Sequence, residues 1–135
     1  MNRQQRTRQR ARGFTLLELV VVIIILAVLA GMAVPRYLKT VNRSYGAEAL
    51  SILGELRASA SRYYARTGDY SNMTMADLDF DPTQTTGAQH FTYDEPDDLS
   101  TTTFSFTATR SVGTGHTIKI DQAGTVTGTG DFSGI

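Results

Sequence analysis

The sequence predicts an α+β protein in which a long N-terminal helix, kinked near Pro35, packs its second half against a small antiparallel sheet. Three observations predict it: an apolar run of twenty-one residues, an amphipathic stretch after it, and a C-terminal half where apolar and polar residues alternate. They divide the chain into a basic segment 1–13, an apolar helix 14–34, an amphipathic helix 35–67, and a loop and sheet region 68–135. We expect the last two to form one globular domain.

Charge is strongly segregated along the 135 residues, although the net charge is zero. Residues 1–13 hold five arginines and no acid, and the rest of the chain holds eight basic and thirteen acidic residues. General nucleic-acid binding needs a basic face, so we predict no specific nucleic-acid partner. The absence of cysteine excludes disulfides and thiol chemistry. No nucleophile motif or phosphate-binding glycine loop occurs, so we expect a protein without enzymatic activity.

The apolar run Phe14–Val34 is long enough to cross the hydrocarbon core of a membrane. The arginines before it favour a cytoplasmic N-terminus. Three interpretations compete: a permanent anchor, a secretory signal cut near residues 31–33, and a leader cut at Gly13–Phe14 that leaves the run on the product. Glu18 separates them, because a carboxylate within such a run costs roughly 2.5–3.5 kcal/mol on insertion scales. A secretory signal gains nothing from this acid, and a lone anchor offers it no partner.

Cleavage after Gly13 supplies that partner. The α-amino group exposed on Phe14 is largely cationic at neutral pH. The Glu18 carboxylate is well placed to meet the amine of a neighbouring copy that is shifted along the helix axis. Because paired charge in an apolar bundle sets register, we expect Glu18 to enforce side-by-side assembly with a fixed offset.

The segment Arg12-Gly13-Phe14-Thr15-Leu16-Leu17-Glu18, followed by the apolar run and Pro35, resembles the type IV pilin and pseudopilin family. The resemblance covers residues 8–66 and implies cleavage at Gly13–Phe14 by a prepilin peptidase, N-methylation of Phe14 and polymerisation into a helical filament. It implies pilus or secretion assembly machinery as a further partner. It also implies a single-pass inner-membrane precursor with a cytoplasmic leader, and a mature form in an extracellular pilus or a periplasmic pseudopilus.

Gly31 and Pro35 mark a weak point in the helix. Proline lacks an N–H and crowds the preceding turn, and glycine costs roughly 0.5–1 kcal/mol of helix stability relative to alanine. We expect a kink here, and the resemblance implies that the stretch can unwind when the subunit enters a filament.

After Pro35, apolar residues recur at steps of three and four, which is typical of a helix with one buried stripe. The stop signal is Arg66-Thr67-Gly68, a basic last turn followed by glycine. The predicted stripe consists of Leu38, Val41, Tyr45, Ala49, Ile52, Leu53, Leu56, Ala60 and Tyr63.

From Gly68 onward the pattern changes to loops and short strands. Thr74 is expected to cap a short turn that includes Asp77. The predicted strands are His90–Tyr93, Thr102–Arg110, His116–Asp121 and Gly124–Gly128. Each has one apolar face, so we expect an antiparallel sheet that packs on the helix stripe. The tail from Gly128 to Ile135 is expected to be irregular or an edge strand.

Two charged groups invite specific interpretations. The acidic residues Asp94, Glu95, Asp97 and Asp98 are weak candidates for calcium ligands, but their spacing matches no defined calcium loop and a solvated loop is favoured. No other cofactor is predicted. The basic residues Arg57, Arg62 and Arg66 are expected to face the acidic domains of neighbouring copies in a filament.

The favoured function is a structural subunit of a type IV pilus-like filament, a homo-oligomer whose roles include adhesion, motility, DNA uptake or secretion. One alternative is a minor pilin or a pseudopilin of a type II secretion system. A second alternative is a membrane-anchored binding protein that never polymerises. In that case, replacing Glu18 with alanine leaves function intact.

Overall fold

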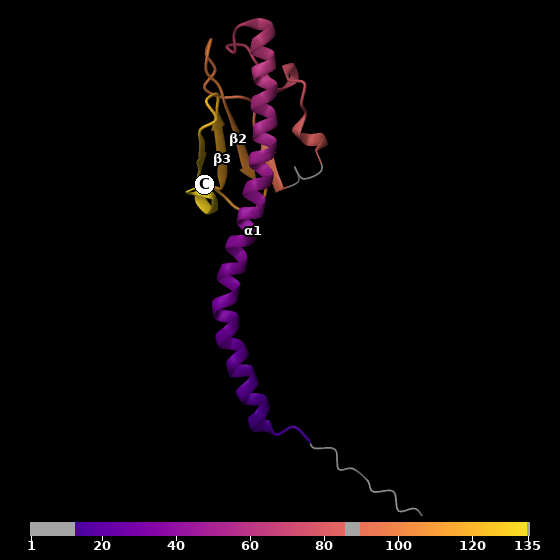
Figure 1. The fold of residues 1–135 in the computed structure, drawn as a ribbon, viewed down its shortest axis with the longest axis vertical. Coiled ribbons are helices and arrows are strands. Elements are labelled where there is room, and N and C mark those ends of the chain that lie inside the picture. The colour runs from indigo at the N-terminus through magenta and orange to yellow at the C-terminus, as the bar shows by residue number, and fades with distance from the viewer. Residues whose placement is uncertain (1–12, 86–89, 135) are drawn as a thin grey trace, which may run out of the picture. The chain divides into compact units, whose positions relative to one another are not determined.

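The computed structural model describes residues 13–85 and 90–134, within two compact units, Met1–Tyr37 and Leu38–Ile135 (Figure 1). The described part of the first unit holds the beginning of one long helix, α1. The second unit holds the rest of α1 and four antiparallel strands. This combination confirms the predicted α+β class.

The helix α1 runs from Leu16 to Thr67 and ends where the sequence predicts. Gly68 adopts a left-handed φ of 74°, and its N–H donates to the carbonyl of Tyr64 at 2.7 Å. Glycine reaches this conformation without steric cost, which makes it a common terminator of helices.

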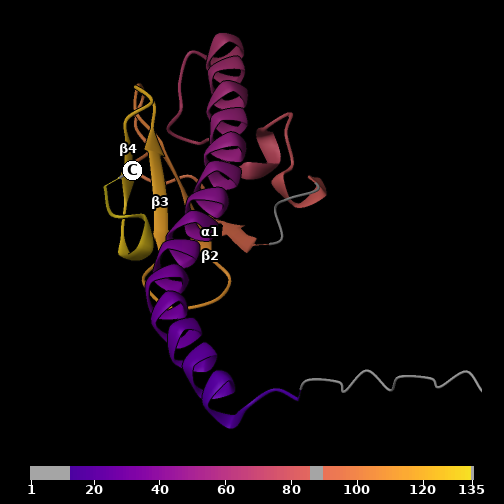
Figure 2. The same ribbon diagram turned by 60° about the horizontal axis from the view of Figure 1, so that its bottom comes forward.

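The four strands form a simple antiparallel meander in the order β1-β2-β3-β4 (Figure 2). Their bounds are Phe91–Tyr93 for β1, Ser105–Arg110 for β2, Thr117–Asp121 for β3 and Val126–Gly128 for β4. Phe106 pairs with Ile120, and Ala108 pairs with Ile118. Because residues two apart share a face, this register places the apolar residues of the central strands on one side.

The core lies between that face of the sheet and the second half of α1. The helix contributes Ala49, Ile52, Leu53, Leu56 and Ala60, and the sheet region contributes Phe91, Phe104, Phe106, Ala108, Ile118 and Ile120. The predicted stripe is therefore buried between Ala49 and Ala60. Its first member, Leu38, is 54% exposed, because the core ends near Tyr45, which packs partly buried at the edge.

All four strands begin later than the sequence predicts, β1 and β3 by one residue, β2 by three and β4 by two. β2 begins at Ser105 instead of Thr102, because the preceding residues close a turn in which the Ser100 hydroxyl accepts the N–H of Thr103 at 3.0 Å. β4 begins at Val126 instead of Gly124 because Gly124 adopts a φ of 87° in the turn after β3. In both places, local turn hydrogen bonds replace pairing with the neighbouring strand.

The C-terminal tail is more ordered than expected. Gly130–Phe132 forms the 3-10 helix η4, and the Phe132 side chain is only 1% exposed. Its ring lies 5.5 Å from that of Phe91, centroid to centroid. A Cβ at Gly128 would overlap the carbonyl of Phe132, so this close approach requires glycine. The sequence pattern does not reveal Phe132 as a core residue, because a single aromatic residue in a glycine-rich stretch carries no periodic signal.

The connection between α1 and β1 contains two 3-10 helices, η1 (Met75–Asp77) and η2 (Pro82–Gln84). The predicted cap at Thr74 is confirmed, since the Asp77 carboxylate accepts the N–H of Thr74 at 2.9 Å. This connection is attached to α1 by Arg62, whose Nε and Nη2 donate to the Asp79 carboxylate at 2.6 and 2.7 Å. The Ser59 hydroxyl donates to the same carboxylate.

The three arginines expected to face neighbouring copies each bind a group of their own domain. Besides the Arg62–Asp79 pair, Arg57 Nε donates to the carbonyl of Gln122 at 3.0 Å, and Arg66 Nη2 donates to that of Asp77 at 3.3 Å. Each arginine therefore has a partner inside its own domain, and the contact of these residues with neighbouring copies in a filament stays a prediction. Sequence position alone did not reveal that loops of the same domain reach these side chains.

Candidate assembly site

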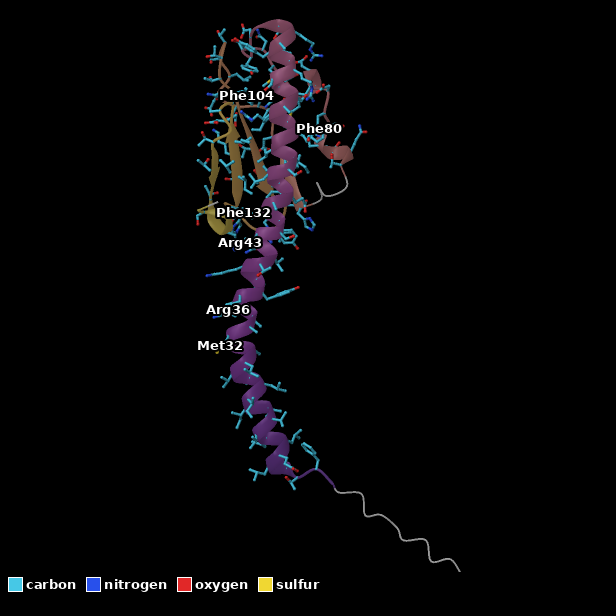
Figure 3. All side chains as sticks on the ribbon, in the orientation of Figure 1. Met32, Arg36, Arg43, Phe80, Phe104 and Phe132 are labelled. Carbon is cyan, nitrogen blue, oxygen red and sulfur yellow. The ribbon has the colours of Figure 1, made fainter. Side chains whose placement is uncertain are left out.

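A continuous apolar surface covers the first part of α1. From residue 14 to residue 34 every side chain is exposed except that of Val20, which is half-buried. Leu16 is 80% exposed and Ile24 is 57% exposed, and the aliphatic side chains project outward from this part of the helix in Figure 3. The segment is long and apolar enough to cross a membrane by length and composition. Exposed apolar surface of this extent marks a region that lipid or another protein chain covers.

Glu18 caps the N-terminus of this helix. Its Oε2 accepts a hydrogen bond from the backbone N–H of Thr15 at 2.9 Å and another from the Thr15 hydroxyl at 3.0 Å. In return, the N–H of Glu18 donates to Thr15 Oγ1 at 3.2 Å. This reciprocal arrangement is a capping box. The role of Thr15 as a cap was not among the predictions, and the Thr-x-x-Glu spacing just before the apolar run is the sequence signal that indicates it.

The cap does not neutralise the charge of Glu18. Both hydrogen bonds from Thr15 go to Oε2, and no hydrogen bond from a described residue reaches Oε1. No ion pair to Glu18 forms among residues 13–85 and 90–134. The partial positive charge of a helix N-terminus favours a carboxylate here, but it is smaller than one unit charge. The negative charge of Glu18, beside a wholly apolar surface, can therefore still pair with a cation from another chain.

Gly13 and Phe14 lie immediately before α1 and are both exposed, Phe14 by 73%. A Cβ built on Gly13 meets no atom within 4 Å. The peptide bond between these residues is consequently open to approach from solvent. Their predicted roles in cleavage and methylation stay predictions.

The helical hydrogen bond that would normally link Gly31 and Pro35 is absent. Pro35 lies inside α1, and it has no N–H to donate to the carbonyl of Gly31, four residues earlier. The helix nevertheless continues through both residues. A methyl group on Gly31 would meet no atom within 4 Å, so packing within this chain does not require glycine. Unwinding at this pair stays a prediction.

The four acidic residues proposed as weak calcium ligands use their carboxylates separately. Glu95 accepts the backbone N–H of the first residue of η1 at 2.8 Å, and Asp98 pairs with Lys119 at 2.6 Å. Asp94 and Asp97 form no ion pair with any described residue. Across the described part of the chain, no three His, Asp or Glu side chains are grouped as a metal site requires.

Two family models match the chain. One, described as the prokaryotic N-terminal methylation motif, matches residues 8–34 and includes Gly13, Phe14 and Glu18. The other, described as type IV minor pilin ComP, DNA uptake sequence receptor, matches residues 35–123 and so covers well over half of the chain.

Three curated proteins illustrate the similarity. Fimbrial protein EcpC of Eikenella corrodens is 41% identical over 61 residues, which are 45% of this chain and 40% of the relative. The type IV major pilin protein PilA of Myxococcus xanthus is 36% identical over 70 residues, 52% of this chain and 32% of the relative. A fimbrial protein of Neisseria meningitidis is 36% identical over 66 residues, 48% of this chain and 39% of the relative. The chain thus spans 32–40% of the length of these relatives. No solved structure matches it significantly.

Proposed function

This chain belongs to the family of type IV minor pilins described as ComP, and from that premise we propose that it is a subunit of a type IV pilus-like filament, assembled through the first part of α1. Pilins are structural proteins and not enzymes, in agreement with the sequence analysis. One observation carries the proposal: Glu18 lies at the head of an exposed apolar helix and has no ion-pair partner among the described residues.

In the proposed sequence of events, the precursor inserts into the inner membrane with residues 1–13 in the cytoplasm. A prepilin peptidase hydrolyses the Gly13–Phe14 bond, which leaves a carboxylate on Gly13 and a new amine on Phe14. Methylation of this amine keeps its positive charge. The amine then pairs with Glu18 of an adjacent copy, while the apolar surfaces exchange lipid for each other.

The test uses cells that express the full chain together with a prepilin peptidase and pilus assembly machinery. Mass spectrometry of filaments sheared from the surface is expected to find this chain beginning at N-methylated Phe14. Replacing Glu18 with glutamine keeps the cap, because glutamine also suits that position of a capping box, but removes the charge. We expect normal insertion and cleavage but about tenfold fewer filaments, which corresponds to a loss of about 1.4 kcal/mol.

Glu55→Gln is the matched control, since Glu55 is an exposed acid of the same helix outside the apolar segment. It should leave the filament yield unchanged. A secreted product that retains residues 1–13, or a Glu18→Gln chain that assembles like the unmodified one, contradicts the proposal. The latter result favours the membrane-anchored binding protein that never polymerises. Fibres confined to the periplasm indicate a pseudopilin of a type II secretion system.

DNA uptake is a second candidate role, favoured by the family description that matches residues 35–123. The charge balance opposes it, because residues 38–135 hold seven basic and twelve acidic residues. Fluorescence anisotropy with a labelled duplex, competed by fragments of the host genome and by unrelated DNA, tests this role. Saturable binding that only particular host fragments displace supports a DNA receptor. Equal displacement by all DNA, or no binding, removes the candidate.

A further inference from the structure

Two cations of the unit Leu38–Ile135 have no partner in the described structure. Five of its seven basic side chains bind groups of the same unit. Lys39 and Arg43 form no hydrogen bond or ion pair with any described residue, and both are exposed. Because they are four residues apart on α1, they lie on the same face of the helix.

These two side chains line a groove of about 780 Å³ between α1 and the C-terminal segment. Leu50, Asp131 and Phe132 form other parts of its wall. The groove therefore combines an apolar floor with two free cations.

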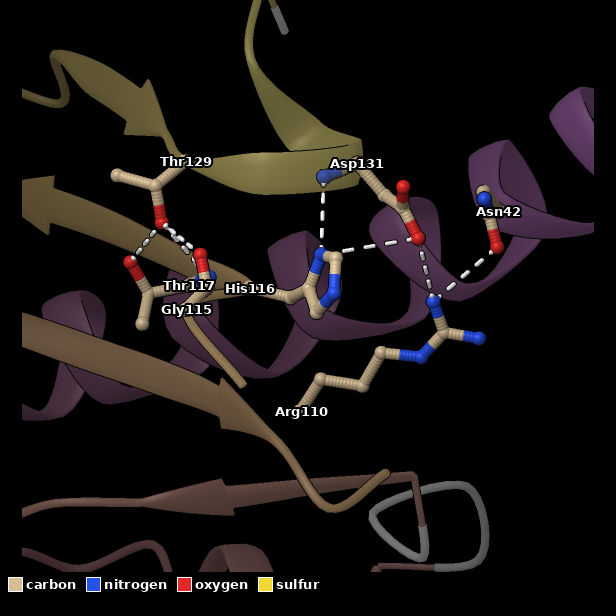
Figure 4. A network of polar contacts seen from close by, with 7 residues as sticks. All are labelled: Asn42, Arg110, Gly115, His116, Thr117, Thr129 and Asp131. Carbon is tan, nitrogen blue, oxygen red and sulfur yellow. Dashed lines mark hydrogen bonds and ion pairs between the residues drawn. The ribbon is translucent and has the colours of Figure 1, made fainter. Parts of the chain in front are cut away.

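A polar network fixes the C-terminal wall of this groove (Figure 4). Arg110 Nη1 donates to Asp131 Oδ2 at 3.0 Å and to Asn42 Oδ1 of α1 at 3.2 Å. The N–H of Asp131 donates to His116 Nδ1 at 3.0 Å. With Phe132 buried beneath it, the wall is held from both the sheet and the helix. The groove is thus formed before any ligand arrives.

An acidic loop, defined as Asp94–Asp98, leads from the middle of the sheet away from the groove, since the N–H of Asp94 donates to the carbonyl of Thr107 and Asp97 pairs with Ser105, where β2 begins. β1 starts opposite Arg110, whose guanidinium reaches Asn42 near the beginning of this part of α1, and runs away from it. The connection that follows β1 reaches the far end of α1, where the N–H of Tyr70 donates to the carbonyl of Thr101 at 3.4 Å. Figure 3 shows Arg43 and Phe104 at the two ends.

Two carboxylates of the acidic loop form no ion pair among the described residues. Those of Asp94 and Asp97 are exposed, and Asp94 Oδ2 accepts one hydrogen bond from the Thr109 hydroxyl at 3.2 Å, whereas the Asp98 carboxylate already pairs with Lys119. In the described part of the chain, the loop therefore presents two anions without a cationic partner, and the groove presents two cations without an anionic partner beside an apolar floor.

We propose that the groove lined by Lys39 and Arg43 binds the acidic loop of the next copy of this chain. The two surfaces are different parts of one chain, so the contact is head-to-tail, the kind of contact that builds a helical filament when the rotation between copies does not close into a ring. Charge complementarity of this kind selects the partner and fixes its register. This inference rests on the proposed function, and it names the surfaces through which the units Leu38–Ile135 of neighbouring copies contact each other in the filament.

Charge reversal tests the contact in the full chain. Lys39→Glu with Arg43→Glu, and separately Asp94→Lys with Asp97→Lys, should each lower the yield of sheared filaments by about tenfold or more, because like charges then face each other. Combining all four changes should restore the yield. A control combines Lys39→Glu and Arg43→Glu with Ser51→Lys and Glu55→Lys. The two added lysines lie at exposed positions of α1 outside the groove and bring the net charge of the chain nearly back to its original value. This control should stay defective.

Crosslinking tests the geometry, and the absence of native cysteine makes it specific. Ala47 lines the groove, so a chain with Ala47→Cys and Asp97→Cys should give a ladder of covalent oligomers with a short bismaleimide. Each single variant should stay monomeric, and a mixture of the two single variants should stop at dimers. Ser51→Cys with Asp97→Cys is the control pair and should give no ladder.

Filaments that form normally without a ladder, or that tolerate both reversals, overturn this inference and leave the proposed function intact. Failure of the unmodified chain to form filaments overturns both. If the Lys39 and Arg43 reversal lowers only the amount of chain extracted from membranes, the groove binds anionic lipid instead. If it lowers only duplex DNA binding, the groove serves DNA, and the proposal fails.

Discussion

Glu18 shows how one side chain can serve two purposes with separate atoms. Its Oε2 accepts both hydrogen bonds from Thr15 that begin α1, and its Oε1 accepts none from the described residues. The cap needs hydrogen-bond acceptors, whereas the proposed contact with a neighbouring amine needs a negative charge. Glutamine preserves the first property and removes the second, so substitution at this residue separates folding from assembly.

The environment of the Asp79 carboxylate predicts that the stability of the fold depends on pH. Hydrogen bonds from Arg62 and then Ser59 hold the pKa of Asp79 well below its usual range. A carboxyl with a lowered folded pKa stabilises the fold above its unfolded pKa, about 3.9, and loses this contribution as pH falls further. We expect Asp79→Asn to melt at a lower temperature than the natural chain at pH 7, with the difference shrinking below about pH 4.

Circular dichroism melts of the full chain in detergent at pH 2 to 7 measure this difference. Asp97→Asn is the control, because the Asp97 side chain forms no ion pair in the described structure and its backbone bonds to Ser105 are retained. Its melting temperature should track that of the natural chain at every pH. A difference between Asp79→Asn and the natural chain that stays constant down to pH 2 contradicts the argument.

At the scale of elements, periodic patterns of apolar residues predict the buried face of a helix and the positions of strands. The three- and four-residue steps from Ala49 to Ala60 predict the buried stripe of α1, and alternation predicts all four strands. Non-periodic features escape this approach. Phe132 enters the core through a 3-10 turn, and Thr15 acts through one local cap that a longer apolar run obscures. Strand starts shift for the same reason, since turn hydrogen bonds at Ser100 and Gly124 are not visible in an apolar pattern.

The short element η4 is predicted to contribute much of the stability of the sheet region through Phe132. This side chain is 1% exposed and packs on Phe91. Phe132→Ala should lower the free energy of unfolding by about 3–5 kcal/mol, the usual cost of removing a buried phenyl ring. Urea unfolding followed by circular dichroism measures it. Val112→Ala, at a position that is 76% exposed, should change the value by less than about 0.5 kcal/mol.

The helix α1 offers a matched pair of glycines for testing the proposed unwinding. Gly31 and Gly54 are both exposed, and a methyl group on either meets no atom within 4 Å. Alanine at either position should favour the helix by about 0.5–1 kcal/mol. If unwinding accompanies assembly, Gly31→Ala should reduce the yield of sheared filaments, whereas Gly54→Ala should not. Pro35→Ala, which restores the hydrogen bond to Gly31, should act in the same direction as Gly31→Ala. Equal yields for all three variants contradict the unwinding.

At the scale of the whole molecule, the sequence predicts where charges are but not which of them are used. Charge segregation suggested that Arg57, Arg62 and Arg66 reach other copies, and the structure shows all three bound within their own domain. Long side chains on a helix are satisfied by whatever loops fold beside them, and that depends on tertiary structure. Only subtraction of these internal contacts leaves Lys39 and Arg43 as the cations of residues 38–134 that have no partner among the described residues.

The division of the chain into two units predicts that residues 38–135 fold without the apolar segment. All buried apolar side chains in the described structure lie between Ala49 and Phe132, and residues 14–34 contribute none. Burial of apolar surface is the main favourable term in folding, so deletion of an exposed segment should leave that term nearly unchanged. A soluble fragment that begins at Leu38 should therefore unfold in urea in a single cooperative transition.

The urea midpoint of this fragment should equal the midpoint at which the sheet region unfolds in the full chain, measured in detergent. The near-ultraviolet circular dichroism of the tyrosines follows both transitions. A second fragment that begins at Ala49 serves as the contrast. It lacks Asn42 and Tyr45, which Arg110 contacts through a hydrogen bond and through its ring face. We expect this shorter fragment to be less stable, because the guanidinium then loses both partners on α1. A fragment from Leu38 that stays unfolded, or that unfolds without cooperativity, means that the apolar segment contributes to the fold as well as to assembly.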